Sequence, residues 1–380
     1  MREYLITLFL VCAVSAIVRT VGPDGVRGTE DDGLPSSIEE FKLLCEYIKN
    51  KGIAPFACWD AFNDSYEIRL TNAIWVNLEG YDGAMAQYNF TTGDNTTKIV
   101  QSFDGNGKPV SVEKQISKEN AWEIYQQESR YWALDFTEYV FKQSNQVMYA
   151  KHWNSGSHTD VHVDFLSGES AMMIEGAYWM NEAKDADTFE LYPEFLDEDV
   201  RFMPLPVQAE GRVTEGNGRT PVALDIGYSY AFINGNVYSK HGEEVAQVAK
   251  EFLQFCYSDN ELAQFTKNSS VSRDLNYSIG DASDLNSVYS QLSKYAQSAW
   301  DVKANGNIVN PISAEPEFIK NPGVFRMYDQ YIWQTNTLNG DSKLKAPNIA
   351  FNKPESEGWT AQRYFNEIKK DQAWWLGLAR

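Results

Sequence analysis

The segment GESAMMIEGAYW, at residues 168–179, constrains the fold of this chain more than any other. Its apolar run at 171–174 is too short for a surface helix and is typical of a buried strand. Gly176 then lets the backbone turn or approach another group closely. Tyr178 and Trp179 follow just past the carboxyl end of the predicted strand, where open α/β sheets bind their ligands. Rings in this place suit a flat, hydroxyl-rich ligand such as a sugar.

The two rings and the carboxylate after them each have a second interpretation. Neighbouring residues of an extended chain point to opposite sides, so one of Tyr178 and Trp179 is expected in the core. Glu182 lies one helical turn after Tyr178. Its carboxylate would hold two sugar hydroxyls, or it is an ordinary solvated charge on a helix face.

Helix and strand patterns alternate along the chain, which predicts an α/β fold. Helices are predicted at 36–50, 66–78, 118–143 and 242–257, and strands at 53–58, 171–174, 201–206 and 222–234. The first helix begins with a capping-box pattern, Ser36 to Glu39, and Gly52 follows its end.

Several segments, in order, resemble the extracellular solute-binding proteins of family 1, the maltose-binding-protein-like receptors of sugar ABC importers. Residues 168–179 are similar to the pattern G-[EK]-x-A-M-x-I-x-G-x-[WY]-W of their C-terminal lobe. DGLPSSIEEF at 32–41 is similar to the helix start P-x-T-W-[DE]-E-F, and RFMPLP at 201–206 to the φ-P-x-P strand. YAFIN at 230–234 and AKEFLQF at 249–255 match the strand and helix that follow. Their order and spacing carry the resemblance, from about residue 32 to the end.

The resemblance implies a type II periplasmic-binding-protein-like α/β fold with an incomplete N-terminal lobe. Members of the family carry a first α/β half-lobe before the helix that starts here at Ser36. We therefore expect an apolar N-terminus and acidic linker at 1–32, a C-terminal-type lobe at 33–215 plus 300–380, and a returning segment of the first lobe at 216–299. The chain is then a fragment or a divergent relative. The helix at 242–257 should be left with an exposed apolar face that favours association.

The resemblance also implies a ligand site between two lobes. In such receptors the loop that corresponds to 55–66 contributes to the sugar site, where Trp59 and Tyr66 would stack on the ligand. Asp60 and Asn63 would bond to its hydroxyls, or this is a surface loop whose Trp59 fills the core.

The returning strand adds two further candidates. Asp225 and Tyr228 lie in that strand, near the expected interlobe cleft. Tyr230 shares a face with Tyr228, and packing is the default interpretation of that ring.

Charge and motifs exclude several classes of function. The chain of 380 residues has 33 Lys and Arg against 53 Asp and Glu, a net charge of −20, which argues against nucleic-acid binding and favours a neutral or cationic ligand. No nucleophile elbow, phosphate loop or Rossmann fingerprint occurs. We expect no cofactor and no enzymatic activity. The alternatives are a secreted carbohydrate-active enzyme, which needs two carboxylates at a defined separation, and a remnant that no longer binds.

Two segments have compositions that metal sites share. The acidic, glycine-rich loop at 24–33 has carboxylates that suit calcium, although its spacing is not that of an EF-hand, and a plain turn is the alternative. His158 and His162 are four residues apart, which on a helix can hold zinc, but their loop-like neighbours favour an ordinary surface segment. We expect no metal.

The N-terminus bears on localisation. Arg2 precedes an apolar run at 4–18 that resembles a secretory signal peptide more than a membrane span. Cys12 lies in a poor lipobox. We expect a bacterial protein in the periplasm or at the outer face of the cell membrane, secreted or lipid-anchored, with ABC permease subunits and a sugar or oligosaccharide as partners.

Overall fold

The computed structural model of the chain describes residues 21–29, 31–59, 67–154, 157, 159–176, 179–185, 188–192, 200–224, 233–269, 288–305, 307–309, 347–352 and 357–378. Contacts divide the chain into two compact units. The first comprises Met1–Glu175, Met203–Ile226 and Asn305–Arg380, and the second Gly176–Phe202 and Gly227–Ala304. The lobes expected at 33–215 plus 300–380 and at 216–299 stay a prediction.

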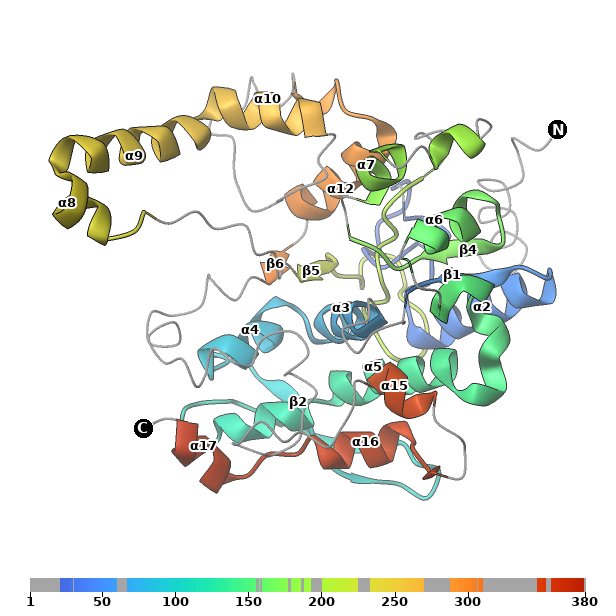
Figure 1. Cartoon of the computed structure of the whole chain (residues 1–380). Helices are drawn as coiled ribbons and strands as arrows, with labels where there is room; N and C mark the ends of the chain where they lie inside the picture. The colour runs from blue at the N-terminus through green and yellow to red at the C-terminus, as the bar shows by residue number, and fades with distance from the viewer. Residues whose placement is uncertain are drawn as a thin grey trace. The chain divides into compact units, whose positions relative to one another are not determined.

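The first unit is an α/β structure (Figure 1). Its α-helices are α2 (Ile38–Asn50), α3 (Glu67–Glu79), α4 (Tyr81–Asn89), α5 (Glu128–Phe141), α6 (Thr159–Leu166), α15 (Pro347–Phe351), α16 (Ala361–Glu367) and α17 (Gln372–Leu378). Its strands are β1 (Ala54–Ala57), β2 (Thr97–Phe103), β3 (Pro109–Lys114), β4 (Ser170–Met173), β5 (Val222–Leu224) and β6 (Asn307–Val309). Short 3-10 helices are η1 (Ala121–Gln126), η2 (Gln143–Met148) and η3 (Lys151–Asn154).

The described strands form three pairs. β1 with β4 and β5 with β6 are parallel, whereas β2 and β3 form an antiparallel hairpin. Parallel pairs separated by helices are typical of α/β folds, so the predicted fold class is confirmed.

The N-cap of helix α2 lies one residue later than its sequence pattern indicated. Ser37 is the N-cap, and its hydroxyl accepts a hydrogen bond from the Glu40 amide at 3.2 Å. The predicted capping box at Ser36 to Glu39 is therefore wrong by one residue. The Glu40 carboxylate accepts instead from the amide and the hydroxyl of Ser36, at 2.9 and 2.7 Å. The contact from Ser37 satisfies one of the amides that a helix start leaves open, and the contacts from Ser36 join the preceding residue to the first turn.

Two other predicted elements differ from the structure. The single helix expected at 118–143 is η1 and α5 with a break at Gln127, whose backbone is extended at φ −56° and ψ 134°. Its buried side-chain amide donates to the Gly83 carbonyl at 2.9 Å and accepts from the Trp75 indole at 3.1 Å. The strand expected at 201–206 is irregular, because its two prolines supply no amide to a ladder. Of the strand expected at 222–234, residues 222–224 form β5, residues 225–232 lie outside the described residues, and residues 233–234 are irregular.

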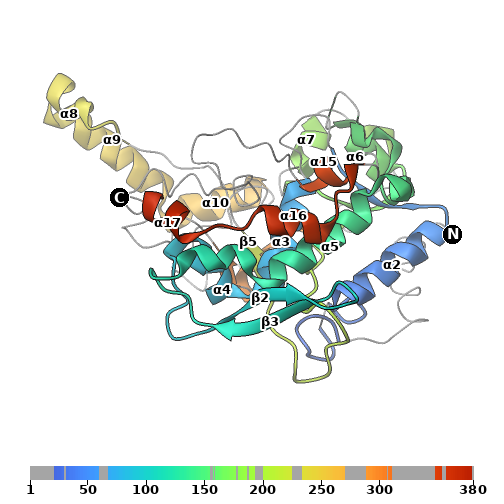
Figure 2. The same ribbon diagram turned by 90° about the horizontal axis from the view of Figure 1, so that it is seen from below.

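Helix α5 is the centre of the first unit's core. Figure 2 shows it alongside the β2–β3 hairpin, with α16 on it as well, and α5 contacts all three. On its α2 side the Phe41 and Phe136 rings stack at 4.6 Å, and Phe56 of β1 meets both edge-on. These rings are at most 2% exposed. Burial of such rings contributes strongly to stability.

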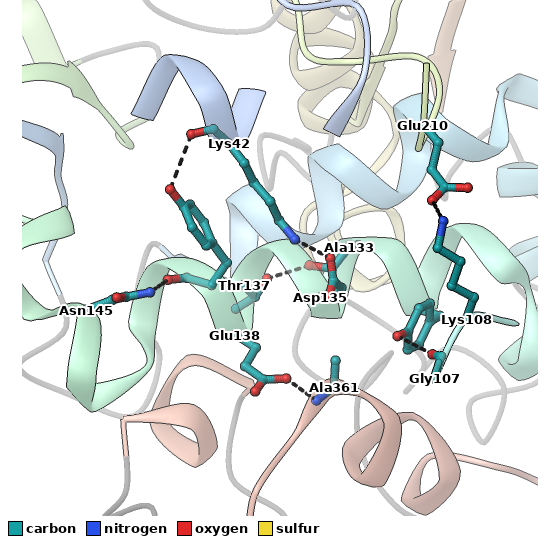
Figure 3. Close-up of polar contacts among 12 residues, drawn as sticks. Lys42, Gly107, Lys108, Ala133, Asp135, Thr137, Glu138, Asn145, Glu210 and Ala361 are labelled. Carbon is teal, nitrogen blue, oxygen red and sulfur yellow. Dashed lines mark hydrogen bonds and ion pairs between the residues drawn. The ribbon is translucent and has the colours of Figure 1, made fainter. Parts of the chain in front are cut away.

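Polar contacts on the surface of α5 fix its neighbours in place (Figure 3). The Lys42 ammonium of α2 lies 2.5 Å from the Asp135 carboxylate, and the Tyr139 hydroxyl donates to the Lys42 carbonyl at 3.2 Å. The Glu138 carboxylate accepts from the Ala361 amide at 2.6 Å, at the first residue of α16. Because a helix N-terminus favours negative charge, this contact anchors α16 to α5.

A side-chain amide takes the place of a strand beside β5. The Asn77 amide nitrogen donates to the Val222 carbonyl at 2.8 Å, and the Asn77 amide oxygen accepts from the Val222 amide at 3.0 Å. Asn77 belongs to α3 and is 4% exposed. The pair joins α3 to the β5–β6 sheet through two reciprocal hydrogen bonds.

The second unit is mainly helical where it is described. It contains α7 (Trp179–Asp185), η4 (Phe189–Leu191), α8 (Asn236–His241), α9 (Glu243–Cys256), α10 (Asp259–Ser269) and α12 (Lys294–Asn305). A small apolar cluster joins α10 to α12 through Leu262, Ala263, Val288, Leu292, Ala296 and Ala299. A search of the described residues finds no helix with the length and apolarity that crossing a membrane requires.

Candidate functional site

The carboxyl ends of β1 and β4 lie at the same edge of one small sheet. Ala54 pairs with Ser170 and Ala57 with Met173 in parallel register. The Ile174 amide continues the pairing by donating to the Ala57 carbonyl at 2.9 Å. Both predicted strands are therefore confirmed, and the segments that follow them leave the sheet at the edge where α/β folds place ligands.

Trp59 follows β1 by two residues and is partly exposed, whereas the intervening Cys58 is 1% exposed. The chain thus turns from the core towards the surface at this edge. Asp60, Asn63 and Tyr66, the other candidates on this loop, lie outside the described residues.

The segment after β4 passes into the second unit. Trp179 begins α7 and is 4% exposed, and its ring meets the Tyr295 ring edge-on at 6.2 Å. Tyr295 in turn stacks on Phe202 at 5.1 Å. Trp179 therefore lies in the core of the second unit. Glu182 is partly buried on the same helix.

The remaining candidates, Tyr178, Asp225 and Tyr228, all lie outside the described residues. Their roles, like those of the described candidates, stay predictions.

The structure adds an aromatic pair that the sequence analysis missed. Tyr149 forms a parallel bridge with Phe56 of β1, and the Ala150 amide donates to the Phe56 carbonyl at 2.9 Å. The Trp153 ring, on η3, meets the Tyr149 ring at 4.8 Å. Residues 149–150 thus form a third backbone segment alongside β1. The sequence of residues 147–150, VMYA, is a short apolar run of the same kind as the one at 171–174, and it could have indicated this segment.

Two histidine–carboxylate pairs lie around α6. The His162 Nε2 atom is 3.5 Å from a Glu175 carboxylate oxygen, and these side chains are 0% and 2% exposed. The His152 Nδ1 atom is 2.6 Å from the Asp164 carboxylate, which also accepts from the His152 amide at 3.0 Å. The prediction that His162 belongs to an ordinary surface segment is therefore wrong, because its side chain is buried. His158 lies outside the described residues.

Glu175 is the carboxylate that the β4 pattern places nearest the strand's end. It comes two residues after Met173, so the sequence indicated its place near the end of β4. The sequence did not indicate that His162 would lie beside it. Across the described ranges, no group of three or more His, Cys, Asp or Glu residues is arranged to hold a metal ion.

The acidic loop at 24–33 uses its carboxylates on its own backbone. Asp24 accepts from the Val26 amide at 2.7 Å, Asp32 from the Gly28 amide at 2.8 Å, and Asp31 from the Asp24 amide at 3.1 Å. Burial raises the pKa of Asp31. These contacts are those of a plain acidic turn.

Ionisable groups are also buried below the surface of the first unit. Arg130 is 0% exposed, and its guanidinium lies 4.0 Å from the Trp75 ring centroid. It donates to the Ile124 carbonyl at 3.1 Å and to the Gln87 side chain at 2.5 Å. Burial lowers the pKa of Arg130 to about 10.

Lys370 and Glu79 extend this buried group. Burial, and then the charge of Arg130, lowers the pKa of Lys370 to about 7. The Lys370 ammonium lies 5.1 Å from the Tyr125 ring centroid. Burial raises the pKa of Glu79, which accepts hydrogen bonds from the hydroxyls of Thr97 and Ser129. No local pattern in the sequence marks these charges as buried.

Comparison with known proteins gives few matches. No protein-family model matches the chain, and no curated protein matches it. A solved structure of a probable secreted solute-binding lipoprotein from Streptomyces coelicolor is similar, with 16% identity and a TM-score of 0.44 over 90% of this chain and 64% of that one. A chitin oligosaccharide binding protein is similar with 12% identity and a TM-score of 0.41, over 91% of this chain and 65% of that one. The chain thus spans slightly less than two thirds of the length of each solute-binding protein.

Proposed function

We propose that the chain is the substrate-binding component, or most of one, of a carbohydrate ABC importer. The parallel pairing of β1 with β4 is the observation that carries this proposal, since it brings the ends of both candidate segments to one edge of a sheet. The ordered motifs from residue 32 onward support the same function. The protein would work outside the cytoplasmic membrane and deliver its ligand to permease subunits.

Binding would rest on ring stacking and a few fixed hydrogen bonds. Trp59 and Tyr178 supply the rings, and Asp60 and Asn63 supply bonds to hydroxyls. A neutral sugar suits this protein, because its net charge of −20 repels anionic ligands and leaves neutral ones unaffected.

Two other functions give different results in the same assay. A secreted carbohydrate-active enzyme would release product, using carboxylates such as Glu175 or Glu182. A non-binding remnant would show neither affinity nor turnover. The Glu175 side chain is 2% exposed, and one of its carboxylate oxygens lies 3.5 Å from the His162 Nε2 atom, which favours a structural use of that group.

The test is calorimetric titration of the purified chain with neutral oligosaccharides derived from maltose, cellulose, xylan and chitin. We expect one class to bind, and Trp59→Ala and Tyr178→Ala to weaken binding by about 1–3 kcal/mol each, the usual effect of losing an aromatic anchor. Tyr257→Ala is the matched control, because Tyr257 is 54% exposed on α9's end and should leave affinity unchanged.

Two outcomes would overturn the proposal. One is an absence of binding across the panel by protein that shows a cooperative thermal transition. The other is steady product release that Glu175→Gln or Glu182→Gln abolishes.

A further inference from the structure

Helix α9 presents a continuous apolar seam to solvent. Val245, Val248, Phe252 and Phe255 are 48%, 64%, 63% and 57% exposed. Their spacings of three, four and three residues are those of the a and d positions of a heptad, so the four side chains form one stripe along the helix. We call these four residues the α9 seam.

The chain uses a different side of the same helix for its own packing. Ala246 is buried and Ala249, Leu253 and Cys256 are partly buried, at the same spacings of three, four and three. The helix therefore carries two adjacent apolar stripes. One is partly covered within the protein, and the α9 seam is exposed.

Acidic side chains border the α9 seam on its open side. Glu244 and Glu251 are exposed and lie seven residues apart. Each comes immediately before a residue of the α9 seam, Val245 and Phe252 respectively. In heptad terms they occupy g positions, which contact the partner helix in a helical pair. The other border, at Ala249 and Cys256, is uncharged.

We propose that the α9 seam is a docking surface for a basic amphipathic helix of another protein. Such a partner would place an apolar stripe on Val245, Val248, Phe252 and Phe255. Its Lys or Arg side chains would lie opposite Glu244 and Glu251. The charge of the border selects this partner, because apolar burial alone does not distinguish one amphipathic helix from another.

A second copy of the chain fits the border poorly. An antiparallel pair of α9 helices brings the two Glu251 carboxylates together, because g positions face g positions in that arrangement. A parallel pair places the glutamates opposite Ala249 and Cys256, which carry no positive charge. The net charge of −20 per chain adds further repulsion between copies.

The inference stands apart from sugar binding, and its test needs no sugar. The probe is a fluorescein-labelled synthetic helix about three heptads long, with Leu at a and d and Lys at e and g. A second peptide has Glu at e and g. Fluorescence anisotropy with the full chain should show that the Lys peptide binds and the Glu peptide does not, and that high salt weakens binding.

Two sets of variants separate the seam from nonspecific attraction to an acidic protein. Phe252→Ser leaves the net charge unchanged, yet it should weaken binding of the Lys peptide by about tenfold or more, since a central anchor is lost. Val248→Ser should act in the same direction, and Leu43→Ser, at a residue 58% exposed on α2, should have no effect. The double variant Glu244→Lys with Glu251→Lys should exchange the preference between the two peptides.

Four results would each overturn the proposal. The Lys peptide fails to bind, or it binds Phe252→Ser and Val248→Ser as tightly as the parent chain. Sedimentation velocity shows a dimer that Phe252→Ser abolishes, which would make a second copy the occupant. Vesicles of phosphatidylcholine bind the chain through Phe252, which would make the occupant a membrane.

Discussion

The surroundings of α5 and the surface of α9 differ in which side chains are buried: charged groups near α5, and few of the apolar groups on α9. On and around α5 the protein buries charge, with Arg130 0% and Lys370 5% exposed. On α9 it exposes apolar rings, with Phe252 63% exposed. The buried Arg130 has the Trp75 ring, a carbonyl and an amide oxygen around it, all supplied by the same chain. The α9 seam has no comparable cover among the described residues.

The difference shows that partners, more than polarity, decide where a side chain lies. A buried guanidinium is tolerated when hydrogen bonds and an aromatic face replace its water. An exposed apolar stripe is tolerated when something outside the chain covers it or when solubility is maintained by charge. The buried charge has its partners within this chain, whereas the apolar side chains of the α9 seam are exposed.

Removing Arg130 should have the largest effect, because it leaves the Gln87 side-chain oxygen without its buried donor and removes one of the two arginine charges that act on Glu79. We expect Arg130→Ala to lower the free energy of unfolding by about 3–5 kcal/mol, measured by urea titration followed by circular dichroism. Arg130→Lys keeps the charge and should recover part of the loss, because an ammonium cannot reproduce the planar stack on Trp75. A loss below about 1 kcal/mol for Arg130→Ala would contradict the view that this region depends on its buried charge.

Lys370 tests the same region through pH. Its pKa is lowered to about 7 in the folded chain from 10.5, so between these values the unfolded chain binds one more proton than the folded chain. The free energy of unfolding should therefore rise with pH from about 7 towards 10.5, by about 1.4 kcal/mol per pH unit from this group. Below pH 7 both states are protonated and the burial penalty is fully present.

The matched control for Lys370 is Lys370→Met, which removes the titration and keeps the bulk. The variant should be more stable than the parent at pH 7, and the difference should shrink by pH 9. The other groups that face Lys370 change little between pH 7 and 9, because the pKa of Tyr125 is raised to about 12 and that of Arg130 is lowered to about 10. Parallel pH profiles for parent and variant would show that Lys370 stays charged when folded.

The smallest effect is expected on α9, where one substitution can be compared in two helices. Val248→Ser on α9 should change the free energy of unfolding by less than about 0.5 kcal/mol, since Val248 is 64% exposed. Val140→Ser on α5 should lower it by about 2–3 kcal/mol, because Val140 is 0% exposed and the change leaves a cavity and a buried hydroxyl. Equal effects at the two positions would mean that the α9 seam is covered within the monomer.

Local patterns predicted those elements whose periodicity is strong. Helix α2, strands β1 and β4, and helix α9 all lie within two residues of their predicted bounds. The exposed apolar face expected at 242–257 is confirmed on α9. Its proposed cause, an incomplete lobe, stays a prediction.

Contacts between distant residues account for what the sequence could not predict. The break before α5 depends on the buried amide of Gln127 meeting Trp75 and Gly83, which lie more than 40 residues away in the sequence. The β2–β3 hairpin was missed, although its turn at 104–108, DGNGK, contains two glycines. Likewise, the pairing of His162 with Glu175 and the burial of Lys370 follow from packing rather than from composition nearby.

The reciprocal bonds between Asn77 and Val222 have a consequence for how the molecule meets others of its kind. In a parallel strand the amide and carbonyl of one residue point to the same edge, so Asn77 occupies the edge of β5 that β6 leaves open. An open strand edge is a template for pairing with a foreign strand. A single carboxamide on a helix thus acts as a terminator of sheet growth. Its loss by deamidation would remove the donor to Val222 and leave a buried carbonyl unpaired, which would weaken the attachment of α3 at this edge.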